Sequence, residues 1–401
     1  MTNRVFVTGY GIITSIGNNA EENFSSLLSG SIGFGEIEIL ETSHRGKLKA
    51  CEVKIADRDL LERLNMADGS GHSRTTLLGL IAAKEAIQSA QLSKNELHQA
   101  AFISATTTGG IRELEKYYRD LQDHSKTGPF AQFAISSNPG DHAERIADYF
   151  NIKGFVNTIS TACSSSANSI MLGGKLIQSG NKQVAICGGA EVLSKFTLNG
   201  FHSLMILDTE HCRPFDKTRN GLNLGEGAAY IVLESEESVK QGNKKILAEL
   251  KGFGNANDAF HQTASSPDGA GAFKAMNLAL QSAGLNSFEI DYINAHGTGT
   301  ENNDLSEGLA IQRLFGDRVP FFSSTKPFTG HTLAAAGAVE AIFSLMSLDG
   351  KLFPSLNFNI PMDELTISPI QQKMQMAGLR NVMSNSFGFG GNTSSLIFSA
   401  V

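Results

Sequence analysis

The hydrophobic residues of the chain fall into short apolar runs that alternate with longer stretches of helical periodicity. Strand-like runs are expected at residues 4–7, 101–104, 155–159, 184–187, 230–233, 246–250, 292–294, 321–323 and 395–398. This alternation is typical of layered α/β proteins. Residues 110–150 carry little strand signal, so we predict a helical insertion that caps the first half and contributes to a pocket and a dimer surface.

Two parts of the chain resemble each other weakly. The strand-like run at 102–110 and the turn after it are echoed at 292–300, and Ala162-Cys163 at one predicted helix start is matched by Gly330-His331 at another. The two pairs recur at offsets of about 170 to 190 residues, which indicates duplication of one α/β unit rather than a short-repeat solenoid. We place the two units at residues 1–245 and 246–401.

Composition narrows the class of protein. The chain has 401 residues and a formal net charge of −7, which argues against nucleic acid or an anionic membrane as the main partner. The four cysteines are Cys51, Cys163, Cys187 and Cys212, without a Cys-x-x-Cys pair. Neither a disulfide framework nor a zinc ribbon is therefore expected. The chain begins directly with a strand-like run, and we predict a soluble protein of the cytoplasm.

Cys163 stands at the strongest local feature. A predicted strand ends in Ile-Ser-Thr-Ala-Cys163-Ser-Ser-Ser and a glycine-interrupted helix follows. A thiol at a helix start lies near unsatisfied N–H groups, which would lower its pKa and could hold a developing oxyanion. The alternative is a small buried thiol. The local sequence leaves both interpretations open.

Two histidines favour the reactive interpretation. His296 lies in the Gly/Thr-rich turn Asn294-Ala-His-Gly-Thr-Gly-Thr after a strand, and His331 follows Gly330 before a small-residue helix. Glycine neighbours give each ring close access to a ligand. Either histidine alone could be a structural residue, but two such loops beside one elbow cysteine indicate a shared site.

Longer motifs carry a family resemblance. They are Val7-Thr-Gly-Tyr-Gly-Ile-Ile-Thr, Arg213-Pro-Phe-Asp-Lys-Thr-Arg-Asn-Gly, Gly225-Glu-Gly-Ala and Asn385-Ser-Phe-Gly-Phe-Gly-Gly. With the cysteine and histidines, they resemble the β-ketoacyl-acyl-carrier-protein synthases, the Cys-His-His branch of the thiolase-fold superfamily. The resemblance implies a thiolase-like α/β fold, with duplicated halves in a five-layer α-β-α-β-α architecture. Cys-His-Asn relatives would carry asparagine in place of His331, and thiolases a second catalytic cysteine beyond Cys212.

The resemblance implies a decarboxylative condensation on carrier-bound acyl groups. Cys163 would hold the acyl chain, His296 and His331 would stabilise the enolate formed from malonyl-carrier-protein, and the backbone N–H groups of Cys163 and Phe389 would form the oxyanion hole. No cofactor is expected, since phosphopantetheine arrives on the acyl carrier protein. The expected assembly is a homodimer, or a heterodimer with a cysteine-less chain-length-factor-like subunit.

Further residues take roles from the same resemblance. Lys326 and Glu340 would form an internal ion pair beside the site, although a loop lysine and a helix glutamate are more often solvated. No catalytic metal is expected. A structural monovalent-cation site would be formed by Asn294, Ala295, Glu340, Ser384 and Asn385.

The gate and acyl pocket are also implied by the resemblance. Their predicted members are Phe387, Gly388, Phe389, Gly390, Phe201 and Thr108. A threonine at 108 replaces an aliphatic residue common in elongating relatives, which suggests an unsaturated or functionalised acyl chain. Carrier docking is expected to rest on basic side chains, namely Lys116, Arg119, Lys126, Arg213 or Lys217, or on a partner subunit.

Three alternatives stay open from the sequence. The chain could be the ketosynthase subunit of a secondary-metabolite heterodimer of aryl-polyene type, or a non-catalytic acyl-binding paralogue that has kept the triad. A cysteine hydrolase would use the same thiolate and oxyanion hole, but it needs one base and not two enolate donors.

Overall fold

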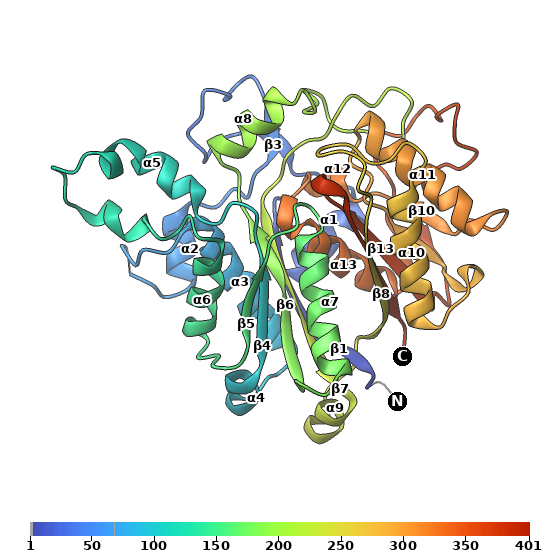
Figure 1. Ribbon diagram of the computed structural model, residues 1–401, viewed down its shortest axis with the longest axis horizontal. Helices are drawn as coiled ribbons and strands as arrows, with labels where there is room; N and C mark the ends of the chain where they lie inside the picture. Colours follow the sequence, from blue (N-terminus) through green and yellow to red (C-terminus); the bar gives the residue numbers. More distant parts are fainter. Residues whose placement is uncertain (1–2, 68) are drawn as a thin grey trace.

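The computed structural model describes residues 3–67 and 69–401. One ten-stranded sheet runs through it in the order β10-β9-β13-β14-β8-β1-β7-β6-β4-β5 (Figure 1). The strands are β1 (Val5–Thr14), β4 (Ala101–Ala105), β5 (Val156–Ile159), β6 (Val184–Glu191), β7 (Gly227–Ser235), β8 (Ala248–Asn257), β9 (Tyr292–Asn294), β10 (Phe321–Ser323), β13 (Asn381–Phe387) and β14 (Asn392–Ser399). Outward from β1, the first half runs β7, β6, β4 and β5, and outward from β8 the second half runs β14, β13, β9 and β10. Corresponding strands of the two halves therefore take the same places, as expected for duplicated units.

Helices divide this sheet into layers. The central helices α7 (Ser165–Gln178) and α13 (Ala336–Ser347) pack on each other and on strands of both halves (Figure 1). On the outer faces, α3 (Arg74–Ser89) and α6 (Pro139–Tyr149) cover the first half, and α10 (Ala270–Ala283) with its neighbour α11 (Glu301–Phe315) covers the second. The predicted α/β class and its five layers are confirmed. The two half-sheets are continuous, because β1 and β8 pair over two residues on each strand.

Glycine allows the central helix to lie between two half-sheets. A Cβ at Gly173 would lie 2.2 Å from the sulfur of Cys187 in β6, and one at Gly174 would lie 3.0 Å from Leu250 in β8. The two glycines therefore face opposite halves of the sheet. Close approach of helix to strand, rather than a turn, explains the glycine-interrupted pattern of α7.

The remaining elements form the rim and the outer surface. They are α1 (Ala20–Ser29), β2 (Phe34–Glu36), β3 (Lys49–Cys51), α2 (Asp57–Arg63), α4 (Lys94–Gln99), α5 (Ile111–Gln122), η1 (Pro129–Phe133), α8 (Lys195–Ser203), α9 (Glu236–Gly242), η2 (Ser287–Glu289), α12 (Lys326–Thr329), η3 (Leu333–Ala335), β11 (Lys351–Leu352), β12 (Met374–Gln375) and η4 (Phe389–Gly391). The predicted helical insertion is confirmed as α5, η1 and α6, and α5 projects from the body in Figure 1.

One long strand was not predicted. β13 carries Ser384, Asn385 and Ser386 at its centre, and this polar run lacks the alternation of a half-buried strand. All three residues are buried between β9 and β14. The Asn385 amide is satisfied there, since it donates to Glu307 at 3.1 Å and accepts from the Ser395 hydroxyl at 2.8 Å.

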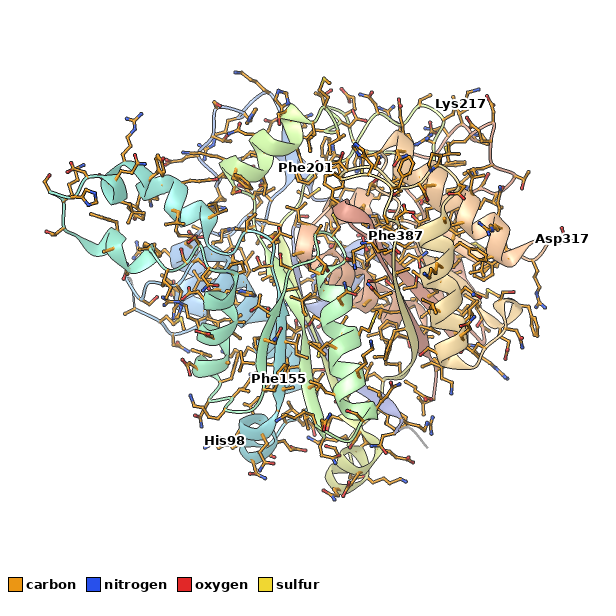
Figure 2. The ribbon with its side chains drawn as sticks, in the orientation of Figure 1. His98, Phe155, Phe201, Lys217, Asp317 and Phe387 are labelled. Atoms are coloured by element: carbon orange, nitrogen blue, oxygen red, sulfur yellow. The ribbon has the colours of Figure 1, made fainter. Side chains whose placement is uncertain are left out.

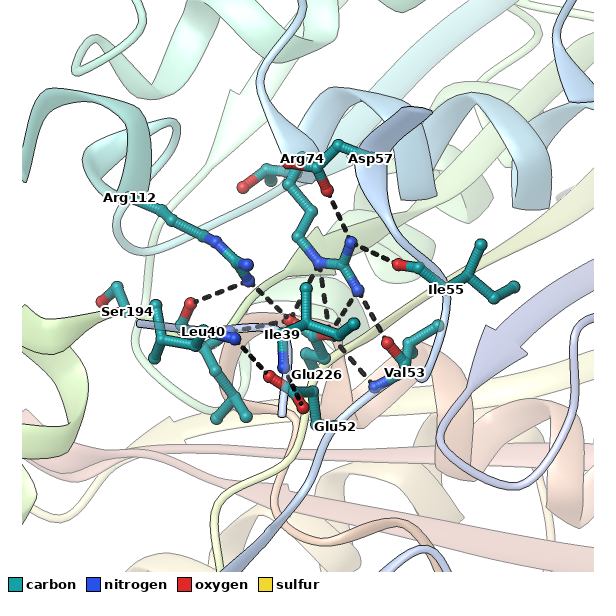
Figure 3. A network of polar contacts seen from close by, with 12 residues as sticks. Ile39, Leu40, Glu52, Val53, Ile55, Asp57, Arg74, Arg112, Ser194 and Glu226 are labelled. Carbon is teal, nitrogen blue, oxygen red and sulfur yellow. Dashed lines mark hydrogen bonds and ion pairs between the residues drawn. The ribbon is translucent and has the colours of Figure 1, made fainter. Parts of the chain in front are cut away.

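A buried ionic network holds the segment before α2 against the start of β7 (Figure 3). Arg74 is fully buried and its guanidinium contacts Glu226 at 2.7 Å and Asp57 at 2.6 Å. Glu226 also accepts the N–H groups of Val53 and Leu193. Arg74 is thus a structural residue. A buried pair of this kind is costly to break because one charge would be left alone.

No helix in the described ranges is both long and apolar enough to cross a bilayer. The boundary at residue 245 falls between α9 and β8 and stays a prediction.

Candidate active site

A strained elbow presents Cys163 at the end of β5. Ala162 has a φ of 53°, a left-handed conformation that is costly for a residue other than glycine. Hydrogen bonds hold it, since the Thr161 N–H donates to Ser165 Oγ at 2.8 Å and the Ser164 hydroxyl donates to the Thr161 carbonyl at 2.8 Å. The predicted order of strand, tight turn and helix is confirmed. The Cys163 residue is 6% exposed.

The fold brings both histidines to this cysteine. The Cys163 sulfur and one ring nitrogen from each of His296 and His331 all lie within 4.8 Å of one another. The imidazole centroids are 5.3 Å apart and the rings are nearly perpendicular, at 84°. The residues come from three separate turns, after β5, after β9 and after α12.

Hydrogen bonds set the same tautomer on both rings. The Lys326 ammonium donates to His296 Nδ1 at 3.1 Å, and the Leu333 N–H donates to His331 Nδ1 at 3.3 Å. Burial, and then the nearby Lys326 charge, lower the pKa of both histidines well below the ordinary value. Each ring is therefore neutral with its proton on Nε2. Both can donate to a developing oxyanion.

Lys326 is held between His296 and Glu340. Its ammonium also donates to the His296 carbonyl at 2.6 Å and contacts Glu340 Oε1 directly. Both side chains are buried, so the solvated alternative is wrong. Burial raises the pKa of Glu340 to about 7 even though Lys326 lowers it.

The expected low pKa of the Cys163 thiol is wrong. Burial raises its pKa to about 11, more than the Lys326 charge and the N–H groups of Phe389 and Cys163 lower it. Helix α7 begins only at Ser165, so the thiol lies one residue outside its N-cap. Desolvation of the thiolate is therefore the larger effect. The thiol of Cys163 is therefore held in its neutral form.

The two N–H groups assigned to the oxyanion hole lie next to the sulfur. The backbone N–H groups of Phe389 and Cys163 both lower the pKa of the Cys163 thiol, as expected for donors close to its sulfur. A Cβ at Gly388 would lie 2.9 Å from the Thr161 carbonyl oxygen and 3.0 Å from the Cys163 nitrogen. Glycine at 388 is thus required for the loop to approach the elbow.

Comparison with known proteins decides the family. A model described as "Beta-ketoacyl synthase, N-terminal domain" matches residues 2–238, and "Beta-ketoacyl synthase, C-terminal domain" matches residues 247–359. The chain belongs to the β-ketoacyl synthase family. It is therefore a condensing acyltransferase, as predicted.

Individual relatives match along the whole chain. The 3-oxoacyl-[acyl-carrier-protein] synthase 2 of Staphylococcus aureus strain COL is 33% identical over 98% of both chains. The structure of the ishigamide ketosynthase/chain length factor has a TM-score of 0.91 with 31% identity, and covers 100% of both chains. A type II polyketide ketosynthase solved with its acyl carrier protein has a TM-score of 0.87 and 25% identity over 100% of both chains.

A cavity of about 350 Å³ leads to the triad of this synthase. One wall is formed by Phe201, Leu204, Met205 and Ile206, and another by Thr298, Thr300 and residues 301–303. Phe389 stacks on Phe201, with centroids 5.8 Å apart and planes at 17°. Figure 2 shows Phe201 on the α8 side of the site and Phe387 on the β13 side. Phe389 is placed where a gate would lie.

Phe387 and Thr108, two predicted members of the gate and pocket, differ in their places, because Phe387 lines the cavity from the end of β13. Phe387 is the last residue of β13, is 5% exposed and packs 5.7 Å from the His296 ring, so it packs as a strand residue and not in a free loop. Among the described residues, those lining the cavity do not include Thr108, whose hydroxyl donates to Glu191 at 2.7 Å. Its place in the acyl pocket stays a prediction. Gly390 has a φ of 80° and donates to the Gln262 carbonyl.

The sequence interpretation missed two carboxylates of the synthase. Glu307 is fully buried and accepts the N–H groups of His296 at 2.9 Å and Gly297 at 2.8 Å. Asp304 accepts the Gly299 N–H at 3.1 Å and the Phe215 N–H at 2.7 Å. Both lie in α11 directly after the histidine turn, with helical spacing. Acidic residues in the first turns of a helix after a glycine-rich loop were the available signal.

Asn392 ties the elbow to the loop that contains Phe389. Asn392 Oδ1 accepts from Ser164 Oγ at 2.6 Å and from Asn168 at 2.8 Å. The elbow and the Phe389 loop are therefore held in one hydrogen-bonded unit.

The predicted cation site has a suitable donor set. Ser384 Oγ and Glu340 Oε2 are buried and have no hydrogen-bond partner in the part of the chain that the structure describes. Asn294 lies beside them, with its amide near the Glu340 carbonyl at 3.4 Å. Unpaired buried oxygens are the ligands that a monovalent cation takes. The site fits such an ion, and its occupancy stays a prediction.

The predicted docking cations are mostly engaged within the chain. Lys126 pairs with Asp120 at 2.6 Å, Arg213 with Asp208 at 3.3 Å and Lys217 with Asp363 at 2.6 Å, whereas Lys116 lies over the Tyr117 ring and Arg119 is exposed on α5. A role for these residues in docking stays a prediction.

Proposed function

We propose that this chain is a β-ketoacyl-[acyl-carrier-protein] synthase in which Cys163, His296 and His331 perform the chemistry. The main support is the geometry of these three residues, in which both rings are Nε2–H donors beside one thiol. One base would be enough for hydrolysis. Two neutral donors beside the sulfur suit an enolate that forms next to a bound acyl group.

Acyl transfer comes first in the proposed reaction. The Cys163 sulfur attacks the carbonyl of an acyl-carrier thioester, its proton passes to the departing pantetheine thiolate, and the C–S bond to the carrier breaks. The N–H groups of Cys163 and Phe389 hold the oxyanion. The pantetheine arm reaches the sulfur through the cavity beside Phe201. Because this arm belongs to the carrier protein, the chain needs no cofactor of its own.

Condensation follows on malonyl-carrier-protein. Its terminal C–C bond breaks and releases CO₂, while Nε2–H of His296 and His331 stabilises the enolate oxygen. The enolate carbon then attacks the acyl-cysteine carbonyl, and collapse of the intermediate expels the Cys163 thiolate with the β-ketoacyl carrier as product. Lys326 orients His296 and keeps its Nδ1 an acceptor.

The test is intact-protein mass spectrometry with a panel of acyl-carrier proteins, followed by malonyl-carrier-protein. We expect one acyl adduct on the wild type, none on Cys163→Ala, and an unchanged adduct on Cys51→Ala, whose thiol is also buried. Addition of malonyl-carrier-protein should release the adduct as a β-ketoacyl carrier. Release as free acid would indicate a hydrolase, and no adduct with any acyl group would indicate a non-catalytic paralogue.

A second candidate is the ketosynthase subunit of a heterodimer. The structural similarity to the ishigamide ketosynthase/chain length factor supports it. Native mass spectrometry of the complex from its own cells distinguishes two identical chains from two different ones. We propose that either assembly works in the cytoplasm, and the four free cysteine thiols support this location.

A further inference from the structure

The rim of the Cys163 cavity carries an unusually exposed apolar turn at the end of α8. Met205 is 88% exposed and Leu204 is 45% exposed, and both line the cavity. Methionine side chains are usually buried in folded proteins. Most of the Met205 side chain, in contrast, does not pack against the described chain. Together Leu204 and Met205 form an exposed apolar patch at the mouth of a cavity, and such patches are typical of interaction sites.

The backbone makes this methionine more unusual. Met205 has a φ of 56° and ends α8 in a Schellman turn, in which the Met205 N–H donates to the His202 carbonyl and the Ile206 N–H to the Phe201 carbonyl. Glycine is the usual residue at this left-handed position, because a side chain is disfavoured there. Neither local conformation nor burial favours methionine at 205.

Charge around the mouth is not suited to an electrostatic contact. Among the described residues that line the cavity, Glu301 is a carboxylate and none is a lysine or arginine. Arg213 and Lys217 are paired with carboxylates, and Arg219 donates to the carbonyls of Thr300 and Glu301. The chain as a whole carries a net charge of −7.

We propose that Leu204 and Met205 form an apolar docking contact for the acyl carrier protein that delivers the thioester. This inference rests on the proposed function. The pantetheine arm must pass this rim to reach Cys163, so the carrier surface around the attachment point lies against it. Methionine is flexible and polarizable, and such side chains adapt to partner surfaces. Docking is therefore apolar and weakly dependent on salt.

The test compares a carrier-bound substrate with a small one. KM is measured for octanoyl-carrier-protein and for octanoyl-pantetheine, with the carrier from the panel that acylates Cys163 fastest. In Met205→Gly the ratio of the two KM values should rise at least about fivefold, which is typical of losing one apolar interface anchor. Glycine suits the left-handed turn, so a folding defect is not expected. Phe196→Ala, at the opposite end of α8 and 62% exposed, should leave the ratio unchanged.

Salt provides the second readout. Between 50 and 500 mM NaCl, the wild-type KM for the carrier substrate should change by less than about threefold, since rim charges carry most of the salt dependence of docking. An unchanged ratio in Met205→Gly, or a tenfold rise of KM with salt, would overturn the docking proposal alone. Failure of octanoyl-pantetheine and every carrier substrate to acylate Cys163 would instead overturn the proposed function.

Discussion

Replacing Lys326 by methionine removes the buried ammonium that holds His296 and pairs with Glu340. Methionine has a similar length and an apolar stem, so the substitution changes charge and hydrogen bonding more than volume. In the wild type the ammonium donates to His296 Nδ1 at 3.1 Å and to its carbonyl at 2.6 Å. No other donor to this Nδ1 is present in residues 3–67 and 69–401.

The expected loss follows from these contacts. Without the ammonium, the His296 ring can carry its proton on Nδ1, and Nε2 then becomes an acceptor that repels the enolate oxygen. A hydrogen bond from a charged group contributes about 1.5–3 kcal/mol, and each 1.36 kcal/mol is about a factor of ten in rate. Decarboxylation should therefore slow by roughly 10- to 150-fold. Glu340 would take up a proton, because an unpaired buried carboxylate is strongly disfavoured.

Two assays separate this effect from general damage. Release of CO₂ from malonyl-carrier-protein measures enolate stabilisation, and intact mass measures acylation of Cys163. Acylation should slow less than decarboxylation, because the oxyanion hole is unchanged and only the effect of the Lys326 charge on the thiol is lost. Lys244→Met is the matched control, since the Lys244 side chain is 7% exposed and pairs with Glu96 at 3.3 Å outside the site. It should leave both rates unchanged.

If Lys326→Met decarboxylates at a rate within about threefold of the wild type, the reasoning is refuted. His296 would then be correctly oriented without a donor at Nδ1. Equal loss of acylation and decarboxylation would refute it as well.

Three further substitutions test the elbow, a buried acid and the ionic network. Gly388→Ala puts a Cβ 2.9 Å from the elbow backbone and should slow acylation by at least about 100-fold. In Gly35→Ala the added Cβ would meet no atom within 4 Å, so acylation should keep its rate. Intact mass measures acylation of both variants. Burial raises the pKa of Glu113 from 4.5 to about 7, so its ionisation destabilises the folded state increasingly from pH 4.5 to 7. Glu113→Gln should then raise the free energy of unfolding in urea by about 2–3 kcal/mol at pH 8 and by little at pH 4.5; an equal change at both values would contradict this. Glu226→Gln removes the buried carboxylate partner of Arg74, which keeps only the partly exposed Asp57, and should lower that free energy by about 3–5 kcal/mol. Lys217→Met, in an exposed pair, should lower it by less than about 1 kcal/mol.

The order of residues along the chain was sufficient for the architecture and the reactive groups. Apolar runs that alternate with helical stretches predicted an α/β fold, because each element shows its own periodicity locally. Cys163, His296 and His331 were recognisable because each lies in a turn with glycine or small neighbours. Such turns allow a side chain to meet a substrate, and their signature lies within a few residues of sequence.

Tertiary structure alone decided the electrostatics and the partners of these groups. The Cys163 pKa is raised because neighbours from distant segments exclude water, which outweighs the helix start visible in the sequence. β13 escaped prediction because its central Ser and Asn residues are buried only through contacts with β9 and β14. The proton positions on His296 and His331 depend on Lys326 and Leu333, and the exposure of Met205 depends on the turn that ends α8. Motifs from the whole chain thus indicated the candidate reactive groups, and packing determined their protonation, orientation and access.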